Sequence, residues 1–333
     1  MFEPPASFPA SAASSSAADA VELPPLRVLL AAPRGFCAGV RRAIDAVRDA
    51  LALHGAPVYV RRPIVHNLAV VRTLEAEGAV FVEELDVVPE GAVVVLSAHG
   101  VAPAIRAEAE RRGFTVYDAV CPLVAKIHRE VKRHHRSGRH VLLVGHQDHP
   151  EVVGTLGHVP EGAATLVGTA EEVAALEIEE GTEVAYAIQS TYSVDEAAGI
   201  VAALESRFPG LAGPQGSDIC YATTNRQAAV RTIAGRAEAV IVAGESFSSN
   251  ARRLAEVASH AGCPAVQLVA DARGLDWSRL RGRATVGVTA AASTPESSVS
   301  GIIQALGARY RLEVEEVEAE PEAAAFRRVN VPC

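Results

Sequence analysis

Short apolar runs alternate with amphipathic stretches along the chain from Arg27 onward. Each run leads into a loop of small and polar residues, and a segment with helical periodicity then follows. The runs are RVLLA, VVVLSA, VYDA, HVLLV, EVAYAI, AVIVA and TVGVTA. Strand–loop–helix units in series predict an α/β fold with parallel sheets covered by helices on both faces.

The units are too many for one small sheet, so two or three similar modules, or a barrel, would accommodate them. A unit restarts near residues 119–121, and a Gly/Pro/Ser connection lies at 214–217. We therefore expect α/β modules at 27–120, 121–217 and 218–310. The Ala/Ser/Pro-rich residues 1–26 are expected to be a disordered tail, and the acidic residues 311–333 a C-terminal tail.

Charge and composition exclude several classes of protein. The 333 residues carry 40 acidic and 31 basic side chains, a net charge of −9, and no basic cluster that could follow a nucleic-acid backbone. No apolar run is long enough for a membrane span, and the N-terminal stretch lacks the basic and apolar regions of a secretion signal. We expect a cytoplasmic protein that binds no nucleic acid or membrane and holds any anion by local chemistry.

Three of the five cysteines, Cys37, Cys121 and Cys220, follow predicted strands and are bordered by Gly, Pro or Thr. Cys263 and Cys333 lack that context. The odd number and the absence of a CxxC pair exclude a disulfide framework and a zinc knuckle. Buried, inert thiols are the simplest interpretation of any one cysteine. Three thiolates at strand ends suit a cubane iron–sulfur cluster with one iron left open.

The histidines fall into two groups. His66, His99, His146 and His149 lie in loops, and each is a capping or surface residue or part of a phosphate-binding cradle. His128, His134, His135 and His140 accompany Lys and Arg, and we expect them to be solvated.

Polar side chains in other post-strand loops complete the candidate site. Glu151 is either a first-turn helix residue or a proton donor. The hydroxyls of Ser190 and Thr191 could relay those protons. Ser248, Ser249 and Asn250 precede a helix, where capping and anion binding are compatible, and Ser293 has a similar context.

The motifs RGFCAGV, IVHN, SAHGV, DAVCPLVAKIH, GHQDHPEVVGT, DICYATTNRQ, SSN…RL and VGVTAAAS occur in this order. From about Val28 to about Leu306 the chain closely resembles the 4-hydroxy-3-methylbut-2-enyl diphosphate reductases, the LytB family. The resemblance implies three α/β modules around a pseudo-threefold centre that holds a [4Fe–4S] cluster. By motif match, its ligands would be Cys37, Cys121 and Cys220, and the fourth iron would take the substrate's allylic hydroxyl.

The resemblance also implies roles for the polar residues. The diphosphate would be bound by His66, His99, Ser248, Ser249, Asn250 and Ser293. His149 and Ser190 would contact the substrate, and Glu151 would donate a proton. The family reaction adds two electrons and protons, expels water, and gives isopentenyl and dimethylallyl diphosphates in the last step of the methylerythritol phosphate route. The electrons come from a ferredoxin or flavodoxin-type partner.

Some positions depart from the family pattern. Ser190 stands where a threonine is usual, Tyr192 adds bulk close by, and Phe247 and Arg252 replace smaller polar residues. One alternative is a paralogue that acts on a related allylic substrate in secondary metabolism. Others are a cluster-dependent hydro-lyase, which needs no net electron input, and a redox- or iron-sensing interaction protein. The presence of Glu151 argues against the sensor, because a sensor needs no proton donor.

Overall fold

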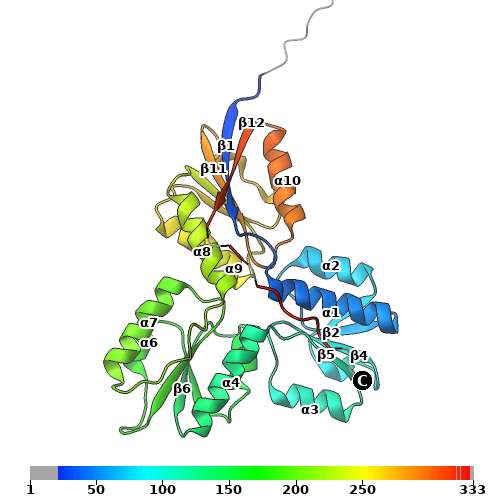
Figure 1. Ribbon diagram of the computed structural model, residues 1–333, viewed down its shortest axis with the longest axis vertical. Helices are drawn as coiled ribbons and strands as arrows, with labels where there is room; N and C mark the ends of the chain where they lie inside the picture. Colours follow the sequence, from blue (N-terminus) through cyan, green and yellow to red (C-terminus); the bar gives the residue numbers. More distant parts are fainter. Residues whose placement is uncertain (1–21, 320, 323, 331–333) are drawn as a thin grey trace, which may run out of the picture.

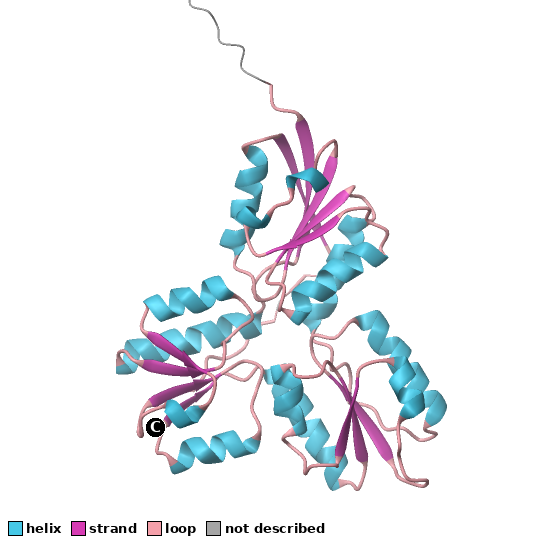
Figure 2. Cartoon of the chain, turned by 180° about the vertical axis from the view of Figure 1, so that it is seen from behind, coloured by secondary structure: helices cyan, strands magenta, loops and turns pink. Residues whose placement is uncertain are grey.

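Three separate sheets form three lobes that meet at one centre (Figures 1 and 2). The computed structural model describes residues 22–319, 321–322 and 324–330. All strand pairings within these sheets are parallel. The expected α/β class with three modules is therefore confirmed, and the barrel alternative is wrong because the described strands form open sheets.

The first module is built on a four-stranded sheet of order β3-β2-β4-β5. Its strands are β2 (Val58–Arg61), β3 (Ala79–Val82), β4 (Val93–Leu96) and β5 (Thr115–Asp118). Its helices are α1 (Ala38–His54), α2 (Leu68–Ala76), α3 (Pro103–Arg111) and the 3₁₀ turn η1 (Leu85–Val87). The apolar face of α1, with Ala43, Val47 and Ala50, packs on this sheet and forms its core with Val58 and Val95.

The second module has a three-stranded sheet of order β7-β6-β8. Its strands are β6 (His140–Val144), β7 (Ala164–Val167) and β8 (Val184–Ile188). Its helices are α4 (Pro122–Arg136), α5 (Pro150–Leu156), α6 (Ala170–Ala175) and α7 (Val194–Arg207). Of the helices in the described part of the chain, none has the length and apolar character needed to cross a membrane.

The third module has a five-stranded sheet of order β10-β9-β11-β1-β12. Its strands are β1 (Pro25–Ala32), β9 (Ala239–Ala243), β10 (Val266–Val269), β11 (Thr285–Ala290) and β12 (Arg311–Glu318). Its helices are α8 (Tyr221–Ala234), α9 (Ser249–His260), α10 (Glu296–Gly307) and the 3₁₀ turns η2 (Ala272–Gly274) and η3 (Trp277–Arg279). Every residue of β9 is buried, because helices cover both faces of the sheet.

The expected module boundaries need correction at both ends. Residues 27–32, assigned above to the first module, belong to β1, which pairs with β11 and β12 of the third module. Residues 311–318, assigned to a C-terminal tail, form β12. Local periodicity identifies a strand but not its sheet, because the partner of a parallel strand lies far away in the sequence. Of the predicted N-terminal tail, residues 1–21 lie outside the described part, and Pro25 and Leu26 are in β1.

The segment after β12 leaves the third module and reaches the first (Figure 1, red). Glu322 forms an ion pair with the buried Arg226 of α8 at 2.5 Å. Farther along, Arg328 pairs with Asp49 of α1 at 2.9 Å, and Val329 packs against the first module's core. This part of the expected tail therefore connects two modules.

Candidate functional site

Each of the three candidate cysteines occupies the N-cap position of a helix, and each helix belongs to a different module. Cys37 precedes α1, Cys121 precedes α4 and Cys220 precedes α8. The Sγ atoms of Cys37 and Cys220 accept the backbone N–H of Val40 and Thr223, each at 3.4 Å. The free N–H groups and the positive end of a helix dipole favour a thiolate.

The three thiols line one cavity at the centre. A methyl group at Gly39 would lie 3.0 Å from the Sγ of Cys121 and 3.8 Å from that of Cys37, so the glycine leaves room between them. Burial, followed by the nearby thiols, raises the pKa of Cys121 to about 11 and that of Cys220 to about 12. A cationic centre among these groups would reverse that effect.

The cysteines do not form a site for a single ion. Among the described residues, no three His, Cys, Asp or Glu side chains converge as ligands of one metal ion. The thiolates that hold a cubane cluster bind different irons, so they surround a volume rather than a point. Three thiols from three helix starts fit that requirement.

Three histidines form another wall of the cavity. The ring centroids of His66 and His99 are 4.3 Å apart, and those of His149 lie 5.4 Å from His66 and 5.9 Å from His99. Burial lowers the pKa of His66 to about 4 and of His149 to about 3, and it holds that of His99 well below its usual value. The rings are therefore neutral at pH 7 and can pack closely without repulsion.

The unpartnered nitrogen atoms of these rings suit an oxygen-rich ligand. The Nδ1 of His149 accepts the backbone N–H of Glu151, so in the neutral ring Nε2 carries the hydrogen. That Nε2, the Nε2 of His66 and the Nδ1 of His99 are buried and have no partner within the described structure. Unpartnered buried polar atoms are costly, so an oxygen-rich ligand would satisfy them.

The start of α9 contributes further polar atoms without a partner in the described structure. Ser248 is the N-cap, and its Oγ accepts the N–H of Ala251 at 3.4 Å. The Oγ of Ser249 and both side-chain polar atoms of Asn250 are buried without a partner in the described residues. The Oγ of Ser293 donates to the carbonyl of His66 at 3.2 Å. Together with the helix N-terminus, these groups are typical of a phosphate site.

Glu151 is the buried carboxyl of the cavity. One oxygen accepts the backbone N–H of Ser190 at 2.6 Å, and the other accepts its hydroxyl at 2.7 Å. Burial raises the pKa of Glu151 to about 7, although the two hydrogen bonds lower it. A carboxyl with this raised pKa keeps a protonated fraction at neutral pH and is able to give a proton.

Comparisons with known proteins agree on one family. The family model described as LytB protein matches residues 28–307. The chain is 55% identical to 4-hydroxy-3-methylbut-2-enyl diphosphate reductase of Paracoccus denitrificans over 304 residues, 91% of this chain and 96% of that protein. It is 54% identical to the protein of the same name from Gluconobacter oxydans, over 91% of both chains. The chain belongs to the LytB family.

Solved structures extend this LytB assignment to the fold. The E-1-hydroxy-2-methyl-but-2-enyl-4-diphosphate reductase of Plasmodium falciparum superposes with a TM-score of 0.86 at 35% identity, covering 93% of this chain and 96% of that one. A second solved structure is that of (E)-4-hydroxy-3-methyl-but-2-enyl diphosphate reductase, the terminal enzyme of the non-mevalonate pathway. It superposes with a TM-score of 0.62 at 29% identity, covering 85% of this chain and 99% of that one. The resemblance inferred from the motifs is confirmed.

The LytB fold brings together the residues singled out for the site except His146, which lies outside the central cavity between Gln189 and Arg253. The central cavity is lined by Cys37, His66, His99, Cys121, His149, Glu151, Ser190, Thr191, Cys220, Ser248, Ser249, Asn250 and Ser293. They come from all three modules, and their individual roles remain predictions.

Two of the departures from the LytB pattern lie differently from what the sequence suggests. Tyr192 does not line the cavity, because its hydroxyl donates to the carbonyl of Gly168 at 2.5 Å and its ring lies against His146. Phe247 is exposed, and its ring meets His66 edge-on with centroids 6.2 Å apart. Tyr192 therefore adds no bulk to the cavity.

Thr223 is a cavity residue that was not predicted from the sequence. It is buried in the first turn of α8, and its Oγ1 lies 3.1 Å from the Sγ of Cys220. The sequence signal for Thr223 was its position three residues after Cys220. The residue at that position of a helix points its backbone N–H at the N-cap side chain, and so lies close to it.

The expectation that the second group of histidines is solvated is wrong for two of them. His128 and His134 are buried on α4, whereas His135 and His140 are half-buried. The helix packs against neighbours on more than one side, so a polar residue type does not identify its solvent face.

Proposed function

We propose that this chain reduces (E)-4-hydroxy-3-methylbut-2-enyl diphosphate to isopentenyl and dimethylallyl diphosphates. Two electrons and two protons enter, the allylic C–O bond breaks, and the hydroxyl leaves as water. The observation that carries the proposal is the meeting of three N-cap cysteines, an anion cradle and a buried protonatable carboxyl in one cavity. The names of the LytB relatives support it.

Cys37, Cys121 and Cys220 would hold a [4Fe–4S] cluster. The support is their placement at three helix starts around one volume, with Gly39 leaving space beside two of the thiols. When bound, the cluster supplies the electrons and an open iron that acts as a Lewis acid on the substrate's hydroxyl. Thr223, within hydrogen-bond distance of Cys220, orients that thiol.

The cradle would bind and orient the diphosphate. His66, His99, Ser249 and Asn250 present buried polar atoms that have no partner among the described residues, and Ser248 and Ser293 flank them. Binding energy from this remote end of the substrate fixes the allyl group against the reacting centre. His149, which shares the wall with His66, would contact the substrate between the two ends.

Glu151 would give the proton that turns the leaving hydroxyl into water. Its pKa of about 7 leaves a protonated fraction at neutral pH, and Ser190 and Thr191 place hydroxyls beside it on the cavity wall. Because the reaction consumes electrons, a ferredoxin or flavodoxin-type donor is needed as a partner.

The first test is an anaerobic assay of the purified, cluster-loaded protein with the allylic diphosphate. We expect isopentenyl and dimethylallyl diphosphates only when a reductant is present. Turnover without reductant would instead indicate a hydro-lyase. Glu151→Gln should lower kcat by about 100-fold or more, since it removes the acidic proton. Glu161→Gln, an exposed glutamate of the same module, is the control and should keep kcat.

The cluster is tested separately by iron and sulfide content with electron paramagnetic resonance of the reduced protein. Changing Cys37, Cys121 or Cys220 to Ser should lower the bound iron and remove the signal. Cys263→Ser is the matched control, because Cys263 is buried away from the cavity. Retained iron in all three variants would contradict the ligand assignment.

A further inference from the structure

A chain of hydrogen bonds runs from the wall of the central cavity to the boundary between the second and third modules. Its first link is Gln189, which is 1% exposed. The Oε1 of Gln189 accepts the backbone N–H of His146 at 2.9 Å, and its Nε2 donates to the Oγ1 of Thr191 at 2.8 Å. Because a backbone N–H can only donate, it fixes which end of the amide faces Thr191.

The second link is the ring of His146. Its Nδ1 lies 2.9 Å from the same Oε1 of Gln189, an atom that carries no hydrogen. Its Nε2 lies 3.1 Å from a terminal nitrogen of Arg253, and a guanidinium can only donate. His146 is therefore a neutral ring with the hydrogen on Nδ1. Burial lowers its pKa, which agrees with that state.

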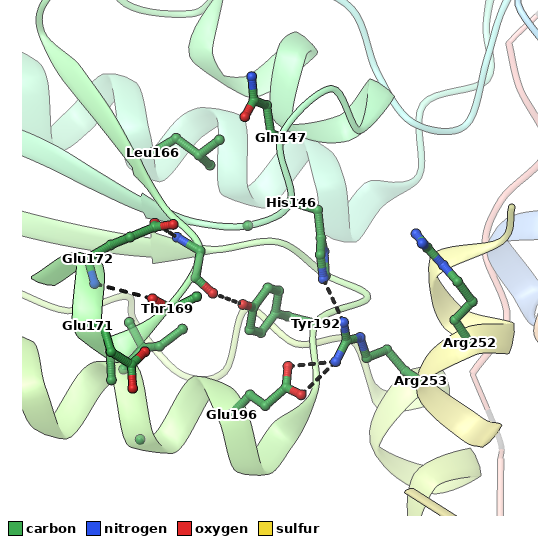
Figure 3. A pocket seen from close by; sticks show the side chains of 15 residues that line it. His146, Gln147, Leu166, Thr169, Glu171, Glu172, Tyr192, Glu196, Arg252 and Arg253 are labelled. Atoms are coloured by element: carbon green, nitrogen blue, oxygen red, sulfur yellow. Dashed lines mark hydrogen bonds and ion pairs between the residues drawn. The ribbon is translucent and has the colours of Figure 1, made fainter. Parts of the chain in front are cut away.

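Arg253 anchors the outer end of the chain (Figure 3). It lies on α9, two helix positions beyond Ala251, and it donates to both carboxylate oxygens of Glu196 on α7 at 2.6 and 2.7 Å. Glu256 lies 2.6 Å from the same guanidinium. The ring of Tyr192 packs against that of His146, with centroids 4.6 Å apart and a tilt of 35° between the ring planes.

These directions restrict the hydroxyl of Thr191, because it cannot donate back to the Nε2 of Gln189. Arg253 donates to His146, His146 donates to Gln189, and Gln189 donates to Thr191. The Oγ1 of Thr191 thus accepts a hydrogen bond from Gln189, outside the cavity, and its own hydrogen is free to point into the cavity that Thr191 lines.

We propose that Arg253, His146 and Gln189 are positioning residues that set the hydroxyl of Thr191 as a hydrogen-bond donor into the central cavity. The acceptor is an electron-rich oxygen of the ligand. With the substrate of the proposed function, on which this identification rests, it is an oxygen of the allylic diphosphate. Ser190, the neighbouring hydroxyl, has the opposite task, because it donates to the carboxylate of Glu151.

Nitrogen-15 spectra of histidine-labelled protein test the direction of the hydrogen bonds from Arg253 to Thr191, and they need no turnover. The wild-type protein should show His146 neutral and protonated on Nδ1 at pH 7, and the signal is assigned by its loss in His146→Gln. A His146 protonated on Nε2 would overturn the proposal. This outcome does not depend on which reaction the cavity catalyses, so it separates failure of this proposal from failure of the proposed function.

Gln189→Glu tests the consequence for catalysis. A protonated glutamate keeps the acceptor and the donor of the amide, whereas the ionised form makes Thr191 turn its hydrogen back. We expect kcat near the wild-type value at low pH and a loss of about tenfold as the new carboxyl ionises, with a smaller change in KM. A kcat reduced equally at all pH values would overturn the proposal.

A double-mutant cycle completes the test. Thr191→Val should lower kcat by about tenfold in the wild-type background and leave it unchanged in ionised Gln189→Glu, because the donor is already lost there. Equal losses in both backgrounds would show that Gln189 does not act through Thr191. Thermal unfolding of each variant records whether the fold is retained.

Discussion

Two groups of buried and half-buried histidines in this protein both have lowered pKa values but differ in their surroundings. His66, His99 and His149 stand in the central cavity, and His128 and His158, here termed the seam pair, lie between the first and second modules. The rings of the seam pair are 4.0 Å apart, and burial lowers the pKa of His128 to about 3 and of His158 to about 4. Both groups contain ring nitrogens without a partner in the described structure.

The neighbours separate the two groups. The central histidines face a cavity with a helix start, serines and an asparagine, where an anion would find donors. The seam pair faces the charges of Arg106 and Lys132, and a methyl group at Gly100 would lie only 2.4 Å from the ring of His128. Burial and a lowered pKa therefore do not identify a binding histidine. A binding histidine is identified instead by space and complementary polar groups around its unpartnered ring nitrogen.

The largest difference should appear in catalysis. His66→Phe keeps an aromatic ring against His99 but removes the polar Nε2 atom, and we expect kcat/KM to fall by about 100-fold. His128→Phe, at the seam, should keep kcat/KM within about threefold, because that ring does not line the cavity. Steady-state assays of both variants measure this. Equal losses would break the distinction between the groups.

Anion binding should distinguish the groups in stability as well. Inorganic pyrophosphate at 100 times its Kd should stabilise the wild-type protein by about 2.7 kcal/mol, measured from denaturant unfolding. His66→Phe should lose most of this gain, whereas His158→Gln should retain it. A gain that survives in His66→Phe would place the anion elsewhere.

Tight packing at the seam predicts a cost for a single methyl group. Gly100 has φ of 76° and sits against His128, so Gly100→Ala should lower the free energy of unfolding by about 2 kcal/mol or more. Gly138→Ala has a similar φ of 80° with nothing within 4 Å, and it should cost about 1 kcal/mol from backbone strain alone. Urea unfolding of both variants gives the comparison, and equal costs would show a loosely packed seam.

The seam pair also predicts acid sensitivity. Its folded-state pKa values lie below the unfolded value of 6.5, so its contribution to stability is complete above pH 6.5 and is lost as pH falls toward 4 and then 3. Removing one titrating ring with His158→Gln should reduce the slope of stability against pH by up to about 1.4 kcal/mol per pH unit in this window. Unfolding free energies between pH 6.5 and 4 measure the slope. An unchanged slope would mean that other groups carry the acid sensitivity.

The sequence predicted the parts of the structure that depend on local chemistry. Strands such as AVIVA are apolar throughout because they are buried on both faces. Cys37 and Cys121 lie in loops after β1 and β5, as predicted, whereas Cys220 follows α7 rather than a strand. The loops belong to three separate sheets, so the rule that post-strand loops meet at one edge does not explain why the three thiols line one cavity. The membership of β1 in the third sheet was not predictable, because its partners are more than 250 residues away.

The sequence also did not predict the side-chain environments that depend on contacts between modules. Nothing in PLVAKIHREVKRHH shows that His128 faces Gly100 of another module. In the same way, Gln189 was only one residue of a polar stretch, and its role depends on His146, which the fold places behind it. The hydrophobic periodicity of a helix predicts one packed face. A second packed face, formed by contacts with another module, is seen only in the folded structure.

The position of β1 has a consequence for how the protein is made. This strand is synthesised more than 250 residues before its two neighbours, β11 and β12. The helix α8, which Cys220 caps, contacts the chain just after β1, because its Arg226 donates to the carbonyl of Gly35 at 2.7 Å. The thiol of Cys220 therefore reaches its final surroundings only after β11 and β12 have been made, and β1 lacks its strand partners until then.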